Sequence, residues 1–435
     1  MENPMSSSVP EQPASPHPST AVASPPPSPT ERIGVLDVLR GIALLGMFVV
    51  HFYDNWAWVS DSPAAAAQRL PWVDTVISLF FDGRFYTMFG ILFGIGFAVQ
   101  LQRADARGER FTARYIRRVL MLAVFGLIAE GVFGYNVLLG YALWALPLLL
   151  VRRWPVRALV VLLVLCAASR PINTVTRFTV LGRDRFVSQV QAKNAAFRAA
   201  SDQRDKDTEA RDWRTVIGAR LRFMPAFYKQ WDTLPWGSFT LFLIGLIGFR
   251  LGLFDQPEAH RRMIIALMVA GCASWAVGNW VLPIGGPLNL PAPGDTPLDV
   301  IGDIGRGNAF MLVRGQWLSF TYIGAVLLLV AHDRAWLTHL SPFAWTGRMA
   351  LTNYMTQVIL LDTLFSRHGL GLAVSPLMGP VYAVALFTAQ VLFSRWWLAR
   401  YRLGPLEWVW RSVTYWKVQP QRIAVPVTGA VPMAA

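Results

Sequence analysis

Long apolar stretches alternate with short polar segments along most of the chain. A membrane-spanning helix needs about 20 mostly apolar residues, and ten stretches come close to that length. They lie at 33–57, 72–101, 117–134, 136–151, 157–178, 236–254, 262–283, 315–331, 344–365 and 376–397. The pattern therefore predicts an all-α fold, a polytopic transmembrane helical bundle of about ten spans.

Three segments depart from this pattern. Residues 1–32 contain 9 Pro and 7 Ser and have no apolar stretch, which predicts a disordered tail. Residues 181–235 place apolar residues at helical spacing among charged ones, which predicts a periplasmic insertion of one or two amphipathic helices. Residues 398–435 predict a cytoplasmic tail whose amphipathic helix, around Glu407–Arg411, lies on the inner leaflet.

Composition and charge agree with a membrane protein. Charged residues make up 15% of the chain, against roughly 25% in average soluble domains, which argues against a soluble enzyme. The net charge of +14 comes from arginines clustered between apolar runs. That distribution is typical of loops held on the cytoplasmic side, whereas nucleic-acid binding needs a solvated basic face. It predicts a multi-pass membrane protein, in contact with the bilayer, with both termini in the cytoplasm.

The first predicted span presents three ionisable side chains on one helix face. Arg40 and His51 are 11 residues apart, so they differ by about 20° in direction and about 16 Å in height. Asp37 lies within about 40° of the same line. Ionisable groups inside a span usually face the bundle interior or a wet cavity. Alternatively, Asp37 and Arg40 form an interface anchor, and His51 is an ordinary interfacial histidine.

Other spans add candidate substrate-binding residues. Asp82 and Arg84 lie near the outer boundary of the second span, where they either contact a substrate or pair with each other. Glu130 is a lone carboxylate inside the third span. It either binds substrate or pairs with Arg170 of the fifth span. Arg348 begins the ninth span at its cytoplasmic end, where it would join Arg40 in binding phosphates.

Several further residues are interpreted as structural. Gly90 and Gly94 are four residues apart, the small-residue spacing of close helix contacts, although a thin helix would also suit an acyl tunnel. His368 falls in a predicted loop and is expected to be solvated. The sequence shows no cluster of Cys and His with metal-ligand spacing, so no metal is expected.

Four motifs resemble the YeiB-like family of bacterial inner-membrane proteins. They are Glu31-Arg32-Ile33 with LDVLRGIALLGM, FYTMFGILFGIGF ending at Phe97, GRMALTNYMTQ ending at Gln357, and GPLEWVWRSVTY ending at Tyr415. The motifs stand in the order found in that family, and the resemblance covers residues 31–418. The sequence departs from the family pattern in the third span, where Glu130 stands near a position that commonly holds histidine.

The resemblance implies a chemistry. This family is similar in design to membrane acyltransferases of the heparan-glucosaminide acetyltransferase type and to envelope O-acyltransferases. The envelope enzymes carry LDxLR in the first span, with ten residues between an Arg and a His, the same spacing as between Arg40 and His51. The implied activity is transfer of an acyl group, most simply acetyl, from cytoplasmic acyl-CoA to an envelope glycan or lipid. His51 would be the catalytic base, Asp37 would orient Arg40, and Arg40 with Arg348 would bind the acyl-CoA.

The same polar residues also suit a different class of protein. A transporter or flippase of a small molecule or lipid-linked substrate would need no covalent chemistry. It would line a continuous path with Glu130, Arg170, Asn279 and Asp362 and would leave His51 unimportant. An enzyme would instead place His51 at a cavity that the donor and the acceptor can both reach.

Overall fold

The structure is a computed structural model of the chain. It describes residues 29–59, 70–135, 137–209, 212–230, 237–281, 296, 317–372 and 378–423. Residues 1–28, most of the predicted disordered tail, lie outside the described residues. Within the described ranges the secondary structure is helical apart from one isolated bridge between Tyr401 and Arg422, so the predicted all-α class is confirmed.

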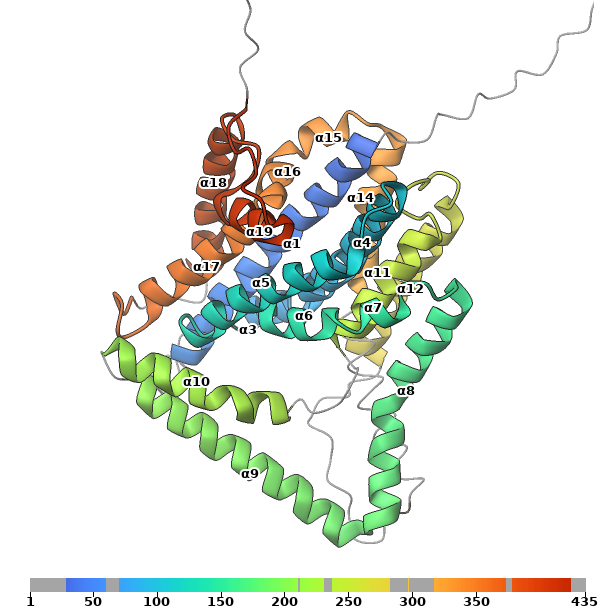
Figure 1. Cartoon of the computed structure of the whole chain (residues 1–435). Coiled ribbons are helices and arrows are strands. Elements are labelled where there is room, and N and C mark those ends of the chain that lie inside the picture. Colours follow the sequence, from blue (N-terminus) through green and yellow to red (C-terminus); the bar gives the residue numbers. More distant parts are fainter. Residues whose placement is uncertain are drawn as a thin grey trace, which may run out of the picture.

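Helices occupy every predicted span (Figure 1). Their bounds are α1 (Pro29–Val59), α3 (Pro71–Phe80), α4 (Arg84–Ala106), α5 (Phe111–Gly131), α6 (Val137–Ala145), α7 (Leu148–Val151), α8 (Val156–Leu181), α9 (Arg183–Thr208), α10 (Trp213–Gln230), α11 (Ser238–Arg250), α12 (Arg261–Ala276), η1 (Val277–Val281), α14 (Leu318–His332), α15 (Trp336–His339), α16 (Ser341–Arg348), α17 (Ala350–Phe365), α18 (Met378–Leu398) and α19 (Pro405–Tyr415). Helix α1 begins before the predicted start at residue 33, with a proline at its first position, where a missing N–H costs nothing.

Helix α1 lies at the centre of the bundle (Figure 1). It packs against α4, α14, α16, α17 and α18. Contact with α16 is close because glycines face each other's backbone: a Cβ added to Gly347 would lie 1.8 Å from the carbonyl oxygen of Asp37. An added Cβ on Gly41 would lie 2.0 Å from the carbonyl oxygen of Phe343. Only glycine permits this approach of the two helix backbones.

Helices α4 and α11 also pack closely through glycines. A Cβ added to Gly90 would collide with the Leu241 side chain, and one added to Gly94 would collide with the carbonyl oxygen of Phe242. On α11, a Cβ added to Gly245 would in turn collide with the carbonyl oxygen of Ile91 in α4. The interpretation of Gly90 and Gly94 as packing residues is therefore confirmed.

Four stretches of the described chain are long and apolar enough to cross a membrane. They are Gly34–Tyr53, Pro71–Ala106, Arg261–Trp280 and Met378–Leu398. The bent pair Val156–Ser169 and Ile172–Leu181 adds a fifth if it forms one span. Shorter apolar helices pack beside them at Val137–Val151, Ser238–Arg250 and Leu318–His332. The chain is thus a multi-pass helical membrane protein, with four or five spans supported by helix length and composition.

Helices α9 and α10 pack side by side at one end of the molecule, with α15 and the start of α1 at the other end (Figure 1). They occupy the segment in which one or two amphipathic helices were predicted. Helix α8 leads into α9, and α10 packs against the end of α5. This hairpin covers the end of the bundle where α5 and α17 finish.

Candidate functional site

A cavity of about 550 Å³ lies between α1, α4, α5, α6, α17 and the C-terminal helix α19. One half is strongly basic, with eight arginines against three carboxylates, Asp37, Glu109 and Glu407. The arginines come from four parts of the chain: Arg40, Arg103, Arg107, Arg114, Arg118, Arg348, Arg402 and Arg411. Such an excess of guanidinium groups attracts phosphates and other anions.

The other half of the cavity is apolar. It begins where α4 and α5 turn from arginine to hydrophobic residues and extends to the start of α6. Its side chains are Met47, Phe89, Leu92, Phe93, Phe97, Val119, Leu122, Val137, Leu138, Tyr141 and Tyr354. The hydroxyl of Tyr141 already donates to the carbonyl oxygen of Tyr86, 2.8 Å away. The cavity therefore has a charged mouth and an apolar interior.

Three predicted residues meet at the mouth. The Arg40 guanidinium donates to the carboxylate of Asp37 at 2.6 Å, and the charge of Arg348 also acts on that carboxylate. Asp37 is buried, whereas Arg40 is partly exposed and Arg348 is exposed. The close contact of Gly347 with α1 holds Arg348 beside this pair. Asp37 is thus placed to orient Arg40, and both arginines line the cavity.

Helix α19 closes one side of the cavity. The Glu407 carboxylate accepts hydrogen bonds from the backbone N–H groups of Leu351 and Thr352, at 2.7 and 3.0 Å, and from the Thr352 hydroxyl at 2.6 Å. It therefore caps the N-terminus of α17, where a negative charge is favoured. Burial raises the pKa of the Glu407 carboxyl, and the hydrogen bonds from Thr352 and Leu351 oppose that shift.

The same helix binds α5 through aromatic and guanidinium groups. The Arg118 guanidinium lies 3.8 Å from the ring centroid of Trp410, whose indole N–H donates to the carbonyl oxygen of Arg118. The Arg117 guanidinium donates to the carbonyl oxygen of Thr414 at 3.0 Å. Helix α19 was predicted to lie on the membrane surface; it is amphipathic, but it packs onto α5 and α17 and forms part of the cavity wall.

His51 lies just beyond the apolar end of the cavity. It stands one helical turn past Met47, the last residue of α1 that lines the cavity. Its ring centroid is 6.4 Å from that of Tyr354, which does line the cavity, and 4.9 Å from that of Tyr135. His51 itself is half-buried and is not a lining residue.

Glu130 belongs to this far end. Its carboxylate accepts a hydrogen bond from the Tyr228 hydroxyl at 2.7 Å, and it lies within electrostatic reach of Tyr354. The expected partner was Arg170, which is part of α8 but whose side chain is outside the described residues. The observed partner comes instead from α10, because the α9–α10 hairpin returns to the end of α5.

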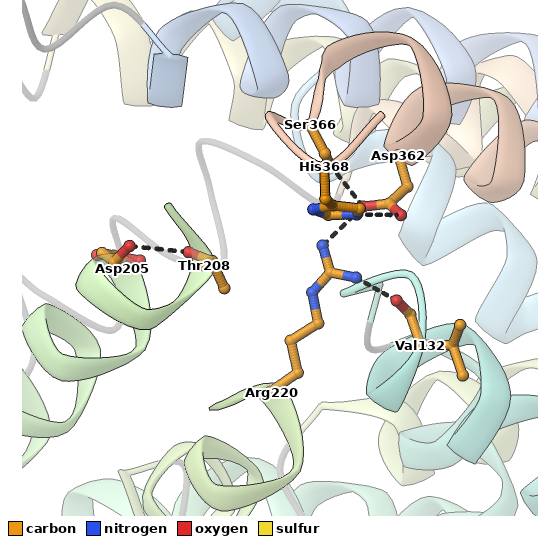
Figure 2. A network of polar contacts seen from close by, with 7 residues as sticks. All are labelled: Val132, Asp205, Thr208, Arg220, Asp362, Ser366 and His368. Carbon is orange, nitrogen blue, oxygen red and sulfur yellow. Dashed lines mark hydrogen bonds and ion pairs between the residues drawn. The ribbon is translucent and has the colours of Figure 1, made fainter. Parts of the chain in front are cut away.

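A second polar network lies where the hairpin meets α17 (Figure 2). The Asp362 carboxylate accepts hydrogen bonds from Arg220 at 2.6 Å and from the Ser366 hydroxyl at 2.7 Å, and the Nε2 atom of His368 lies 3.1 Å away. Arg220 also donates to the carbonyl oxygen of Val132 at the end of α5.

The expectation that His368 is solvated is wrong. Its side chain is 1% exposed, packed against Trp213 with ring centroids 4.2 Å apart. The loop folds back because the backbone N–H of Leu370 donates to the carbonyl oxygen of Thr363. That turn places His368 beside Asp362, six residues earlier in the chain.

The remaining predicted residues lie apart from the cavity. Asp82 is exposed, whereas Arg84 is 2% exposed and donates to the backbone carbonyl of Asp82 rather than to its carboxylate. The carbonyl oxygen of Arg84 accepts a hydrogen bond from Ser319 of α14. Asn279 of η1 donates to the carbonyl oxygen of Trp275 at the end of α12, four residues earlier. In the described part of the chain, Glu130, Asn279 and Asp362 do not line this cavity.

Sequence reasoning missed most of the arginines at the mouth. Those of α4 and α5 were interpreted as topology signals, and Arg402 and Arg411 as parts of a cytoplasmic tail. A usable signal was the spacing of Arg114 and Arg118, four residues apart on one face of a predicted helix. Four arginines of the 103–118 segment therefore line the cavity as well as marking one side of the bundle: Arg103, Arg107, Arg114 and Arg118.

Comparison with known sequences places the chain among bacterial relatives. Residues 248–417 match a family described as "Protein of unknown function (DUF418)". The uncharacterized protein YxaH of Bacillus subtilis (strain 168) is 30% identical over 419 residues, which cover 90% of this chain and 96% of the relative. The uncharacterized protein YeiB of Escherichia coli (strain K12) is 28% identical over 422 residues, covering 88% and 96%.

A third relative, an uncharacterized 39.9 kDa protein encoded in an amylase 3′ region of Bacillus acidopullulyticus, is 28% identical over 403 residues. Those residues cover 88% of this chain and 94% of the relative. No solved structure matches the chain significantly. The similarity thus extends over nearly the whole length of each relative.

Proposed function

The chain belongs to the DUF418 family, and we propose that this member is a membrane acyltransferase. It takes an acyl group from cytoplasmic acyl-CoA and passes it to a hydroxyl or amine of an envelope glycan or lipid. The observation that carries the proposal is the cavity, which joins an arginine-lined mouth to an apolar interior and ends beside His51.

The proposal includes a topology. We propose ten spans in the bacterial inner membrane, with both termini in the cytoplasm. The arginines of the loop between α4 and α5 and those after α18 then lie on one side. The hairpin of α9 and α10 lies on the other side, in the periplasm. Helix α5, the α6–α7 segment, the bent helix α8 and helices α11, α14 and α17 add six spans to the four longer stretches.

The mouth suits the donor's head. Acyl-CoA is anionic through its phosphates, and Arg forms bidentate hydrogen bonds with phosphate oxygens. Arg40 and Arg348 line this end, with Asp37 holding Arg40 in place. Arg103, Arg114 and the other mouth arginines add a positive field that draws the donor from the cytoplasm.

The far end suits the transfer step. His51 removes the proton from the acceptor hydroxyl, whose oxygen then attacks the thioester carbonyl. The carbon–sulfur bond breaks, and the proton leaves with the CoA thiol. Histidine suits this step because its ordinary pKa of about 6.5 lies close to working pH. Glu130 and Tyr228 supply hydrogen-bonding groups at this end for the acceptor.

The test is transfer of labelled acyl groups. Full-length protein in lipid nanodiscs receives radiolabelled acetyl-CoA and an extract of envelope lipids and glycans. Label should move to an envelope fraction with wild type and should fall at least a hundredfold with His51→Ala, the lower range of general-base contributions. The matched control is His332→Ala, an exposed histidine at the end of α14, which should retain transfer.

Donor binding separates the possible failures. His51→Ala should still bind acetyl-CoA, since the arginines remain. Transfer that persists in His51→Ala would show that His51 is not the base. If wild type neither binds acetyl-CoA nor transfers label, the acyltransferase proposal is wrong and transport becomes the function to test.

A further inference from the structure

The hydroxyl of Tyr354 is a buried polar group at the apolar end of the cavity. Tyr354 belongs to α17, is 4% exposed and lines the cavity. Among the described residues, no group accepts a hydrogen bond from this hydroxyl. Gln357 and His368 also bury a polar atom that has no partner in the described chain, but neither of them lines the cavity. Buried polar groups are normally hydrogen-bonded, so the Tyr354 hydroxyl calls for an explanation.

The start of α6 lies against this hydroxyl. Val137, the first residue of α6, also lines the cavity, and its backbone N–H acts on the hydroxyl oxygen of Tyr354. A backbone N–H can only donate, so this contact does not use the hydrogen of the hydroxyl group. The positive end of the α6 dipole lies there too, and it favours negative charge nearby. The Tyr354 O–H is thus placed to donate to an acceptor that a ligand in the cavity supplies.

Helix α17 holds the hydroxyl in a fixed place. The Glu407 carboxylate binds the N–H groups of its first turn. Asn353, the neighbour of Tyr354, donates to the carbonyl oxygen of Thr346 and to the Ser394 hydroxyl, both at 3.1 Å. A donor that is fixed before the reaction needs no reorganisation when charge develops in front of it.

Tyr354 also lies close to His51. Their ring centroids are 6.4 Å apart, and the two rings are inclined at 65°. A general base lies about 3 Å from the oxygen whose proton it removes, and an oxyanion donor lies about 3 Å from the carbonyl oxygen that becomes negative. The separation of the two rings suits a reacting carbonyl group between the His51 imidazole and the Tyr354 hydroxyl.

We propose that Tyr354 is a catalytic residue whose hydroxyl donates to the thioester carbonyl oxygen and stabilises the negative charge that forms there. This inference rests on the proposed function and adds the group that acts together with His51. As the acceptor oxygen bonds to the carbonyl carbon, His51 takes the acceptor proton and the carbonyl oxygen becomes negative. The Tyr354 hydroxyl binds that oxygen and keeps its own proton. When the carbon–sulfur bond breaks, the carbonyl double bond forms again and the proton passes from His51 to the CoA thiolate.

The test removes the hydroxyl alone. Full-length Tyr354→Phe in nanodiscs is compared with wild type for transfer of labelled acetyl groups and for acetyl-CoA binding. Removal of one oxyanion donor lowers kcat about a hundred- to a thousandfold, so transfer should fall by that factor. Acetyl-CoA affinity should stay close to that of wild type, because the charge forms only in the transition state. The unfolding temperature should change little, since the hydroxyl hydrogen has no acceptor among the described residues.

The matched control is Tyr86→Phe on α4. Tyr86 does not line the cavity, and its hydroxyl lies 2.6 Å from the Ser238 hydroxyl. Loss of that hydrogen bond should lower the unfolding temperature and leave transfer unchanged. The same chemical change should therefore affect catalysis at Tyr354 and stability at Tyr86.

The pH dependence of transfer separates a direct role from an indirect one. His51 should still set the pH profile in Tyr354→Phe, so the rate should fall without a shift of the profile. A shifted profile would show that Tyr354 acts through His51 as a positioning residue, which overturns the catalytic assignment.

The remaining outcomes are also distinguishable. Transfer at the wild-type rate by Tyr354→Phe, together with loss of transfer in His51→Ala, would overturn the role of Tyr354 and leave the proposed function standing. Equal loss of acetyl-CoA binding and transfer in Tyr354→Phe would show that the hydroxyl binds the donor before the reaction, which also overturns the catalytic assignment. Absence of both acetyl-CoA binding and transfer in wild type would overturn both proposals.

Discussion

The two ends of the bundle both contain buried or half-buried arginines, but in opposite electrostatic settings. At the mouth of the cavity eight arginines face three carboxylates. At the hairpin, Arg220 is matched by Asp362 and a backbone carbonyl, and Asp362 is further supported by Ser366 and His368. An excess of positive charge in a cavity favours binding of an anionic ligand from outside the protein. A balanced and fully bonded pair instead fixes two elements to each other. We interpret the first end as a binding site and the second as a latch.

The largest effect is expected from breaking the latch. Arg220→Met leaves the 2%-exposed carboxylate of Asp362 without its cation, and loss of one partner of a buried pair costs about 3–5 kcal/mol. Thermal unfolding in detergent should show this loss, while acetyl-CoA binding at the mouth stays unchanged. The double variant Arg220→Met/Asp362→Leu should recover part of the stability, since no charge is then left unpaired, although Ser366 and His368 lose their acceptor. A loss below about 1 kcal/mol in the single variant, the size typical of surface pairs, would refute the latch.

A smaller effect, on binding rather than on stability, is expected at the mouth. Arg348→Gln removes one phosphate-binding group, and a hydrogen bond to a charged group is worth about 1.5–3 kcal/mol. Acetyl-CoA binding should weaken about ten- to a hundredfold by titration calorimetry, with the unfolding temperature almost unchanged. The control is Arg367→Gln, an exposed arginine whose pair with Glu209 spans 3.5 Å. Equal binding by Arg348→Gln and wild type would contradict the assignment of the mouth.

Gly347→Ala should affect packing and binding together. The new Cβ meets the carbonyl oxygen of Asp37 and pushes α16 away from α1, which costs about 1–3 kcal/mol as overpacking. Because Asp37 and Arg348 move apart, acetyl-CoA binding should weaken as well. Gly140→Ala is the control, because an added Cβ at Gly140 meets no atom within 4 Å. It should change neither the stability nor acetyl-CoA binding. Loss of stability with unchanged binding would show that the mouth tolerates displacement of α16.

The smallest effect concerns Asp212 at the start of α10. Its carboxylate accepts hydrogen bonds from the Thr215 backbone N–H and hydroxyl, at 3.0 and 2.9 Å, which lower the pKa of Asp212. A lowered pKa means that this cap stabilises the folded hairpin above the ordinary pKa of 3.8 and is lost as pH falls through the folded value. After correction for the pH dependence of intrinsic amide exchange, hydrogen exchange should show lower protection in the first turn of α10 under acid conditions. Asp212→Asn should lack this pH dependence; if it retains the dependence, another group is responsible.

The helices and the residues of one helix face could be predicted from the sequence. Apolar stretches identified the long helices of the bundle, and helical geometry placed Asp37 and Arg40 together. Arg348 was expected beside Arg40 because both begin spans at the same side of the membrane. These predictions depend on local periodicity and on alternation of sides, which the chain determines without tertiary information.

The partners of the outer end could not be predicted in this way. Arg220 reaches Asp362 across 142 positions, and Tyr228 reaches Glu130 across 98. Those contacts depend on where the α9–α10 hairpin docks, which its amphipathic pattern does not encode. His368 was misjudged for the same reason, because a loop position says nothing about a partner that folds over it. Substrate roles for Asp82, Glu130 and Arg84, and the catalytic role of His51, stay predictions.

The contribution of α19 to the cavity wall has a consequence for biogenesis. Trp410 and Glu407 come from the last part of the chain, yet they hold α5 and the start of α17. Helices made early in synthesis must therefore wait in the membrane until the ribosome has released residues 405–415. Under the proposed function, a nascent chain lacks this wall of the donor site, so we expect donor binding only after translation is complete.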